Sequence, residues 1–282
     1  MPDAPDELRV AAYFDFAAHP FEHEALFHRA GVETVVDALG QIAPYCAEWL
    51  AAQHGPACRV ERIDGVAVHV EAGAVFQPGR VFGGGRPGRI IVGAGAVVRG
   101  GEYDVAAGDV HIGAGASLWG AWIAGPALIG CGTEIRPGAY LRGGVIIGRN
   151  DVIRGELKNA VVMDNAQFPH PSYLGDSICG YGSHFGNQAT AANVNVFGGH
   201  GTIKITVNGR RIDLGRRKVG IILGDYAQVG CNAVSDPGTF LRPRTIVYPL
   251  TRINSGVYGP GEVLKNKPME HGVIERARLR DE

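Results

Sequence analysis

The sequence lacks any apolar run approaching the ~20 residues that a helix needs to cross a bilayer. Its N-terminus, MPDAPDELRV, is acidic and has no apolar signal-peptide core. The cysteines are few and scattered without a CxxC pair, which argues against a zinc site and fits a reduced cytoplasm: Cys46, Cys58, Cys131, Cys179 and Cys231. We therefore expect a cytoplasmic protein with no membrane partner and no bound metal.

Net charge is also nearly absent, at -1, so the composition gives no reason to propose nucleic acid or an anionic membrane as a partner. Hydrophobic residues make up 45% and charged residues 20%, which is typical of a globular chain. Glycine is abundant instead, with 43 residues, about twice its average usage. No collagen period accompanies it, so glycine is expected at turns that need a positive φ.

A six-residue repeat is the clearest pattern in the chain. Within IGCGTEIRPGAYLRGGVIIGRNDVI, aliphatic residues recur every six positions, at Ile129, Ile135, Leu141, Ile147 and Ile153. Neither the helical period nor the strand period of two produces this spacing. A hexad repeat predicts one side of a parallel β-helix, with three sides closing each coil. The inward aliphatic residue of each side stacks on its equivalent in the next coil, so stability is a sum over neighbouring coils.

The N-terminal residues 1–55 differ from this pattern. They are rich in Ala, Glu and Leu at helical spacing, and we predict helices near 21–29, 31–39 and 41–53. The interpretation that we favour is an α-helical cap over one end of the solenoid, because terminal coils must hide their exposed edges. A separate functional domain is the alternative.

The solenoid itself is predicted over 56–268. Residues 196–218 break the period, and KITVNGRRIDL within them predicts a surface hairpin that turns at Asn208-Gly209. Cys179 and Phe185 are six apart, so Cys179 is expected to be a small inward-facing residue and not a nucleophile. The tail, 269–282, is a candidate C-terminal helix.

Four motifs together carry a resemblance: RPG at 136–138, ELKNA at 156–160, HxxYLGDS at 170–177 and GxNAVxxPGT at 230–239. Residues 125–265 resemble the left-handed β-helix, or hexapeptide-repeat, family of sugar-phosphate acetyltransferases and nucleotidyltransferase-like proteins. They are most similar to the acetyltransferase half of bacterial N-acetylglucosamine-1-phosphate uridyltransferase/glucosamine-1-phosphate acetyltransferase. The resemblance implies a left-handed, all-β parallel β-helix that assembles as a homotrimer and uses acetyl-CoA.

The nucleotidyltransferase activity of that family is not expected here. It requires a nucleotide-binding α/β domain that opens with a glycine-rich loop. GGGRPGR at 83–89 follows no N-terminal strand and opens no helix, so it fails the structural context of a phosphate loop. We interpret it as a glycine-rich coil corner, and 55 residues before the solenoid cannot hold such a domain.

His170 stands where the acetyltransferases that this sequence resembles have their catalytic histidine. Imidazole titrates near neutral pH and can take the proton of an attacking amine. The alternative is a surface histidine in a turn set by Pro169 and Pro171. Tyr173 follows three residues later and is expected to hydrogen-bond the substrate, or else to pack on the coil face.

Two cations match positions that hold the sugar phosphate in the family, Arg136 and Lys158. Cations from neighbouring coils can clamp a phosphate, and arginine can make two parallel bonds to it. The alternative for each is a solvated charge beside a coil. Arg142 and Arg154 are expected to be such solvated charges, although either could assist.

Asn193 matches a family asparagine that contacts the sugar, and an amide both donates and accepts hydrogen bonds. A corner asparagine that tolerates the left-handed region is the alternative. His184 stands where the bifunctional enzyme has asparagine, so it either contacts substrate or faces His170 or a partner subunit.

The family usually has GAG where this chain reads Gly186-Asn187-Gln188. Small residues there let the thioester approach the backbone, so Asn187 and Gln188 imply a different acyl group or no use of acyl-CoA. Nearer the C-terminus, three residues are expected to line a pantetheine groove: Cys231, Tyr248 and Arg252.

These observations lead to one principal hypothesis, acyl-CoA-dependent transfer to the amino group of a sugar phosphate or nucleotide sugar. A non-catalytic module that binds a sugar phosphate or nucleotide is the first alternative. A transferase that uses another acyl or carbamoyl donor is the second.

Overall fold

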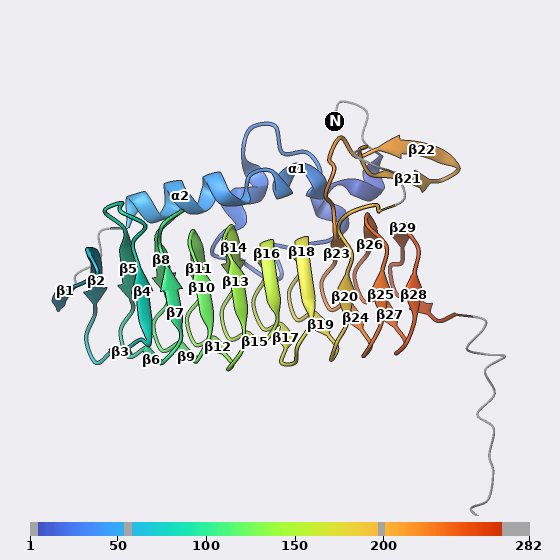
Figure 1. Cartoon of the computed structure of the whole chain (residues 1–282). Coiled ribbons are helices and arrows are strands. Elements are labelled where there is room, and N and C mark those ends of the chain that lie inside the picture. Colours follow the sequence, from blue (N-terminus) through green and yellow to red (C-terminus); the bar gives the residue numbers. More distant parts are fainter. Residues whose placement is uncertain (1–4, 54–57, 197–200, 267–282) are drawn as a thin grey trace, which may run out of the picture.

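The computed structural model describes residues 5–53, 58–196 and 201–266. Its body is an all-β parallel solenoid whose coils stack from β2 to β30, with helices lying along one side (Figure 1). Within the described residues, no helix has the length and apolar character that crossing a membrane requires. The candidate helix at 269–282 lies outside the described residues.

The solenoid has three faces, each a ladder of short parallel strands, and we name each face by its first strand. The β2 face contains β2 (Val66–Val70), β5 (Arg89–Val92), β8 (Val110–Ile112), β11 (Ala127–Ile129), β14 (Val145–Ile147), the second halves of β16 (Glu156–Val162) and β18 (Tyr173–Cys179), β23 (Ile221–Leu223), β26 (Thr239–Leu241) and β29 (Gly256–Tyr258).

The β3 face contains β3 (Val75–Gln77), β6 (Val97–Arg99), β9 (Ser117–Trp119), β12 (Glu134–Ile135), β15 (Val152–Ile153), β17 (Gln167–Phe168), β19 (His184–Phe185), β24 (Gln228–Val229), β27 (Ile246–Val247) and β30 (Val263–Leu264). The β4 face contains β4 (Arg80–Phe82), β7 (Glu102–Asp104), β10 (Trp122–Ala124), β13 (Tyr140–Arg142), the first halves of β16 and β18, β20 (Thr190–Ala191), β25 (Val234–Ser235) and β28 (Arg252–Ile253). At the N-terminal end, β1 (Arg59–Ile63) pairs antiparallel with β2 and so closes that edge of the ladder.

Inward side chains stack in rows along the axis. Ile112, Ile129 and Ile147 are aligned in successive coils, and each is almost completely buried. Cys179 continues this row, aligned between Val162 and Leu223 and fully buried, so it is an inward-facing residue as the spacing predicted. Burying one such aliphatic side chain contributes about 1.5–3 kcal/mol, and the stacked rows therefore form the main core.

The glycine-rich segment 83–89 turns the chain between β4 and β5. Gly84 and Gly85 have φ values of 59° and 79°, a region that residues with a Cβ rarely occupy. Its position between two strands of one coil, with no helix after it, is that of a coil corner.

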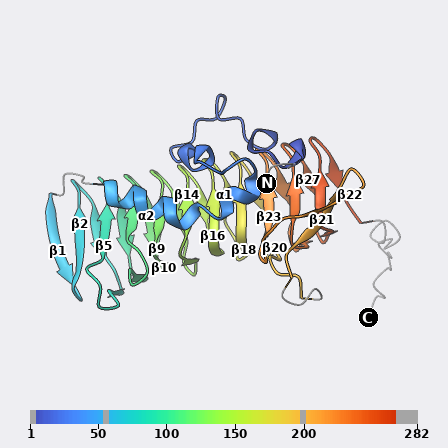
Figure 2. The ribbon, with the colours of Figure 1, turned by 90° about the horizontal axis from the view of Figure 1, so that it is seen from above.

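The N-terminal segment corrects the expectation of a cap over one end. Its elements are the 3₁₀ helices η1 (Asp6–Leu8), η2 (Val10–Ala12) and η3 (Glu24–His28), followed by α1 (Val35–Leu39) and α2 (Ile42–Ala52). Viewed from above, α1 and α2 run along the solenoid across the β2 face (Figure 2). The physical reason is that the outward side chains of this face are apolar, and they share one buried cluster with the helices: Leu128, Ile146, Val161, Ile178, Ile222 and Phe240.

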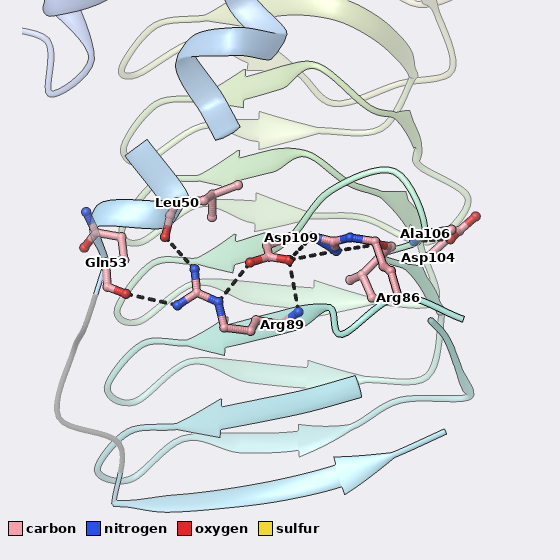
Figure 3. Close-up of polar contacts among 8 residues, drawn as sticks. Leu50, Gln53, Arg86, Arg89, Asp104, Ala106 and Asp109 are labelled. Atoms are coloured by element: carbon pink, nitrogen blue, oxygen red, sulfur yellow. Dashed lines mark hydrogen bonds and ion pairs between the residues drawn. The ribbon is translucent and has the colours of Figure 1, made fainter. Parts of the chain in front are cut away.

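Arg89 fastens the end of α2 to the coils. Its Nη2 donates to the carbonyl of Leu50 at 2.7 Å and its Nη1 to that of Gln53 at 3.2 Å (Figure 3). These carbonyls lie at the helix C-terminus, where the Leu50 carbonyl otherwise accepts only from Gln53 N at 3.2 Å and the last carbonyls lack the i+4 donors of the helix interior. The solenoid therefore supplies the C-terminal cap of α2.

The excursion between β20 and β23 contains an antiparallel hairpin of β21 (Lys204–Val207) and β22 (Arg210–Asp213). Asn208 and Gly209 form its turn, with φ values of 48° and 76°. Ile205 and Val207 are buried in the same cluster as the N-terminal aromatic residues. One side of the hairpin therefore packs on the N-terminal segment and does not project freely; residues 197–200 lie outside the described part.

Candidate functional site

The corner between the β3 and β4 faces brings three of the predicted residues into one row. His170 lies in the bend between β17 and β18, and its side chain is exposed. The strand registers align it with Asn187 in the next coil and with Cys231 in the coil after that. Backbone bonds confirm this stacking, since Asn232 N donates to Asn187 O at 2.9 Å.

His184 lies on the β3 face, near the corner that holds His170. It is half-buried on β19, aligned between Gln167 and Gln228. Burial lowers the pKa of His184, and the neighbouring His170 imidazole lowers this pKa further. The two rings are thus within electrostatic reach, and His184 is held neutral at neutral pH. A role for His184 towards the substrate, His170 or a partner subunit remains a prediction.

Arg136 reaches the same corner from two coils away. Its Nε donates to Glu134 at 2.8 Å, and its Nη1 lies 3.4 Å from the carbonyl of Pro169, the residue before His170. Both side chains of this ion pair are partly exposed, so the pair itself adds little stability. The guanidinium is therefore a cation close to the histidine backbone. Arg154 instead donates to the Pro137 carbonyl at 3.0 Å.

Tyr173 and Asn193 meet on the β4 face above Gly175. A Cβ at Gly175 would lie 2.5 Å from the Tyr173 hydroxyl and 2.7 Å from Asn193 Nδ2, so this glycine makes the meeting possible. Burial raises the pKa of Tyr173, as does the Glu156 charge, while a hydrogen bond from Asn193 lowers it. Tyr173 is consequently a neutral hydroxyl beside an amide.

Asp176 holds that amide in a buried chain of hydrogen bonds. Asn193 Nδ2 donates to one Asp176 carboxylate oxygen at 2.7 Å, and Asn159 Nδ2 donates to the other at 2.9 Å. Asn159 also donates to the carbonyl of Leu39 at the end of α1, at 3.2 Å. The Asp176 carboxylate therefore fixes the orientation of the Asn193 amide beside Tyr173.

Sequence reasoning gave no role to Asp176 or Asn159. A signal was present, because Asn159, Asp176 and Asn193 each follow the previous one by 17 residues, which is one coil here. Only a correct register across β16, β18 and β20 turns that spacing into a contact.

Lys158 stands beside Tyr173, aligned with Gly175 in the β16–β18 register. Within the described residues, its ammonium makes no hydrogen bond or ion pair. Arg142 is in the preceding strand, and its Nη1 pairs with Glu156 at 2.6 Å. Two cations therefore occupy the β4 face between β13 and Tyr173.

The remaining candidates lie nearer the C-terminus and do not form one groove. Tyr248 is exposed at the corner two coils beyond Asn187. Arg252 is on the β4 face, where its Nη2 lies 2.9 Å from Asp236. It borders a pocket of about 260 Å³ together with Lys204 and Ile203 from the hairpin region. Cys231 and Asn187 thus share a row with His170, whereas Arg252 belongs to a different surface.

The departure from GAG has a defined geometry. A Cβ at Gly186 would lie 2.6 Å from Cys231 N, so this glycine allows two coils to stack closely. Asn187 is partly buried, and Gln188 is exposed with a φ of 55°. Their side chains occupy the corner immediately beside His170. In the described part of the chain, no group of three or more His, Cys, Asp or Glu side chains could hold a metal ion.

Comparison with known proteins finds relatives that are named as bifunctional enzymes. The chain is 36% identical over 131 residues to the "Bifunctional sugar-1-phosphate nucleotidylyltransferase/acetyltransferase" of Sulfurisphaera tokodaii, covering 46% of this chain and 32% of that protein. It is 33% identical over 104 residues to the "Bifunctional protein GlmU" of Methanocaldococcus jannaschii, covering 36% and 25%.

A longer match is to the "Bifunctional protein GlmU" of Nocardia farcinica, with 29% identity over 203 residues, or 70% of this chain and 40% of that protein. The chain therefore spans less than half the length of these curated relatives. No protein-family profile matches the sequence.

Proposed function

We propose that this chain, a homologue of bifunctional sugar-1-phosphate nucleotidylyltransferase/acetyltransferases over part of their length, transfers an acyl group from acyl-CoA to the amino group of a phosphorylated sugar. The observation that carries the proposal is the position of His170, exposed at a coil corner with Tyr173 and a neutral His184 beside it. The solenoid fold is consistent with the acetyltransferase activity in the relatives' names.

The reaction needs an amine, a thioester and a base in one place. The amine nitrogen attacks the thioester carbonyl carbon, so that a C–N bond forms and the C–S bond breaks. His170 takes the proton that the nitrogen loses, and CoA leaves as a thiolate that is then protonated. The base is expected to contribute about 10²–10⁴-fold to the rate. Most of the remaining acceleration comes from holding the two reactants in line.

The acceptor is held by groups on both sides of His170. Arg136 and Lys158 bind phosphate oxygens, while Tyr173 and the amide of Asn193 orient the sugar hydroxyls. The acyl-CoA, acetyl-CoA in the simplest case, follows the corner past Asn187 and Cys231 towards Tyr248. This proposal includes a left-handed coil and a homotrimer, since flat solenoid sides and corner sites favour assembly between copies.

A second candidate is favoured by one observation, the bulk of Asn187 and Gln188 at the corner beside His170. If those side chains exclude the thioester, the protein binds a phosphorylated sugar without turning it over. A third possibility is transfer from a donor with another acyl or carbamoyl group. In that case Asn187 and Gln188 would select the group that fits beside His170.

The test uses His170→Ala with His28→Ala as the control, because His28 is also exposed but lies in η3. For an acyltransferase, His170→Ala lowers kcat about 10²-fold or more and leaves acceptor affinity nearly unchanged. The assay pairs a panel of acyl-CoAs with amino-sugar phosphates and nucleotide amino-sugars. Absence of turnover by the wild-type protein across the panel would favour the binding module.

A further inference from the structure

The β4 face carries one outward row that leads to Tyr173. In successive coils, the strand registers align Trp122 with Tyr140, Tyr140 with Glu156, and Glu156 with Tyr173. Adjacent strands are about 4.8 Å apart, so Trp122 and Tyr140 lie roughly 10 to 15 Å from Tyr173 along the face. The row places an aromatic pair at a fixed separation from the proposed sugar site.

Trp122 and Tyr140 are unusually exposed for residues of their size, each at 40%. The two ring centroids are 6.1 Å apart with the rings nearly perpendicular, at 76°, and the Phe82 ring stacks with Trp122 at 5.9 Å and 20°. The rings are therefore held in place by one another while a large part of each is open to solvent. Held aromatic rings of this kind provide stacking surfaces for planar ligands.

A groove of about 550 Å³ runs beside these rings along the β3/β4 corner. Its floor is made of small residues, including Gly101, Gly120 and Gly138. A Cβ at Gly101 would lie 2.4 Å from the Ala121 carbonyl oxygen, so a larger residue would not fit here. Glycine therefore allows the coils to pack closely and leaves the groove without a side chain at this position. The volume is within the range of sites that bind small organic ligands.

Two cations lie in the row beside the aromatic pair, Arg142 on the same strand as Tyr140 and Lys158 on the next strand towards Tyr173. Arg142 extends over the Tyr140 ring, with Cζ 5.6 Å from the centroid, and Lys158 is in the neighbouring strand. The carboxylate of Glu156 neutralises part of this charge through its ion pair with Arg142. Lys158 has no such partner among the described residues. Along the face, the order is thus aromatic rings, cations, then the sugar-binding hydroxyl and amide.

We propose that the acceptor is a nucleotide sugar, whose base stacks on Trp122 with Tyr140 at its edge, while Arg142 and Lys158 bind its diphosphate. The order of chemistry on the face matches the order of base, phosphates and sugar in such a molecule. The two to three strands between the rings and Tyr173 give room for the ribose and diphosphate. Glu102, a carboxylate on the same groove, favours a base that offers an N–H donor.

This inference rests on the proposed acyl transfer for its last step, delivery of the sugar amine to His170. Base recognition stands on separate residues, since Trp122 and Tyr140 are three and two coils, respectively, from the His170 corner. The two ideas can therefore fail independently, and the experiment separates them.

The experiment compares Trp122→Ala with Trp119→Ala. Trp119 is an equally exposed tryptophan in the same coil, at 43%, but it lies on the β3 face. Binding of UDP, GDP, CDP and ADP is measured by calorimetry with each protein. At least one nucleotide is expected to bind the wild type and to lose about five-fold or more in affinity in Trp122→Ala, as stacking of a base on an aromatic ring implies. Trp119→Ala should bind as the wild type does.

Catalysis is then compared with UDP-glucosamine and glucosamine 1-phosphate as acceptors. The inference predicts a lower KM for the nucleotide sugar, and predicts that Trp122→Ala removes this advantage without changing KM for the sugar phosphate. Equal KM values, or equal nucleotide affinity in both tryptophan variants, would overturn the inference while acyl transfer could still stand. Nucleotide binding that depends on Trp122 without any turnover would retain the base site and remove the proposed enzyme activity.

Oligomeric state is followed by light scattering in the same samples. If Trp122→Ala dissociates the protein and leaves nucleotide affinity unchanged, the aromatic pair is a contact between copies, and the inference is wrong.

Discussion

Arg89 forms an ion pair with Asp109 of the next coil and holds the end of α2 with the same guanidinium. Arg89 Nε donates to Asp109 Oδ2 at 2.9 Å, and the other arm of the same guanidinium holds the last carbonyls of α2 (Figure 3). Asp109 is mostly buried and also receives Arg86 at 2.7 Å. The relationship explains how an 11-residue helix stays in place along a solenoid face.

Arg89→Ala is expected to destabilise the protein by about 1.5–3 kcal/mol, the range for hydrogen bonds to charged groups. The reason is that the Leu50 and Gln53 carbonyls and the mostly buried Asp109 carboxylate each lose a charged donor. Urea unfolding measures the change. Arg59→Ala is the control, since its pair with Glu61 is about half exposed and should contribute little. Equal effects of the two substitutions would mean that Arg89 does not fasten the helix.

Acid should weaken the contact between the N-terminal segment and the β2 face. Burial lowers the pKa of both His23 and His111 from 6.5 to about 4, and both rings contact Trp49. The unfolded chain therefore binds more protons than the folded one between pH 4 and 6.5. The stability from the two neutral rings is fully present above pH 6.5 and is lost as pH falls towards 4.

For each histidine, the difference between a pKa of 6.5 in the unfolded chain and about 4 in the folded protein corresponds to at most roughly 3 kcal/mol of unfolding free energy. Unfolding free energies measured by urea at pH 7, 5.5 and 4.5 should show this loss, and Trp49 fluorescence reports the same contact. In His111→Phe the loss of unfolding free energy at acid pH should be smaller, because phenylalanine has no nitrogen to protonate and only His23 contributes. A pH dependence identical to the wild type would rule out His111 as a contributor.

Asp176→Asn should raise KM for the acceptor about five- to ten-fold with a much smaller change in kcat, as expected when a binding group loses its orientation. The new amide cannot accept from both Asn159 and Asn193, so the Asn193 side chain is free to rotate. Asp164→Asn is the matched control, since Asp164 is an equally buried corner carboxylate that binds Arg149. If both variants lose stability but have the same KM as each other, Asp176 has only a structural role.

Restoring small residues at the family's GAG position tests donor choice. Asn187→Ala with Gln188→Gly should fold well, because Gln188 has a φ of 55° that glycine adopts without strain. We expect higher acetyl-CoA-dependent turnover, or a changed preference among acyl-CoAs, as the corner beside His170 opens. Turnover and donor preference identical to the wild type would show that these two side chains do not limit the donor.

The sequence predicted the solenoid because its signal is local. Each coil side needs one inward aliphatic residue and a corner that tolerates positive φ, and both recur every six residues within Ile129–Ile153. For the same reason, spacing alone predicted that Cys179 faces inward. A further local signal went unused: strands such as Val145–Ile147 and Ile221–Leu223 are apolar at every position, which indicates burial on both sides.

The candidate site was only partly predictable for the same reason. His170 and Tyr173 are close in sequence, and their motif could be recognised without knowing the register. The chain Asn159–Asp176–Asn193 depends on which residues of different coils become neighbours. Coil lengths vary, with Val145 aligned to Ala160 but Ile178 aligned to Ile222, so a fixed period does not supply that register.

The sequence by itself determined the repeating coil, its inward rows and the hairpin turn at Asn208-Gly209, since each depends on residues a few positions apart. Only the tertiary structure decided that the N-terminal helices lie along the β2 face, because that placement depends on an apolar surface assembled from many coils. It also decided that Trp122 and Tyr140 share a row with Tyr173. Stacking of coils converts distances along the chain into neighbours about 4.8 Å apart, and this conversion is global.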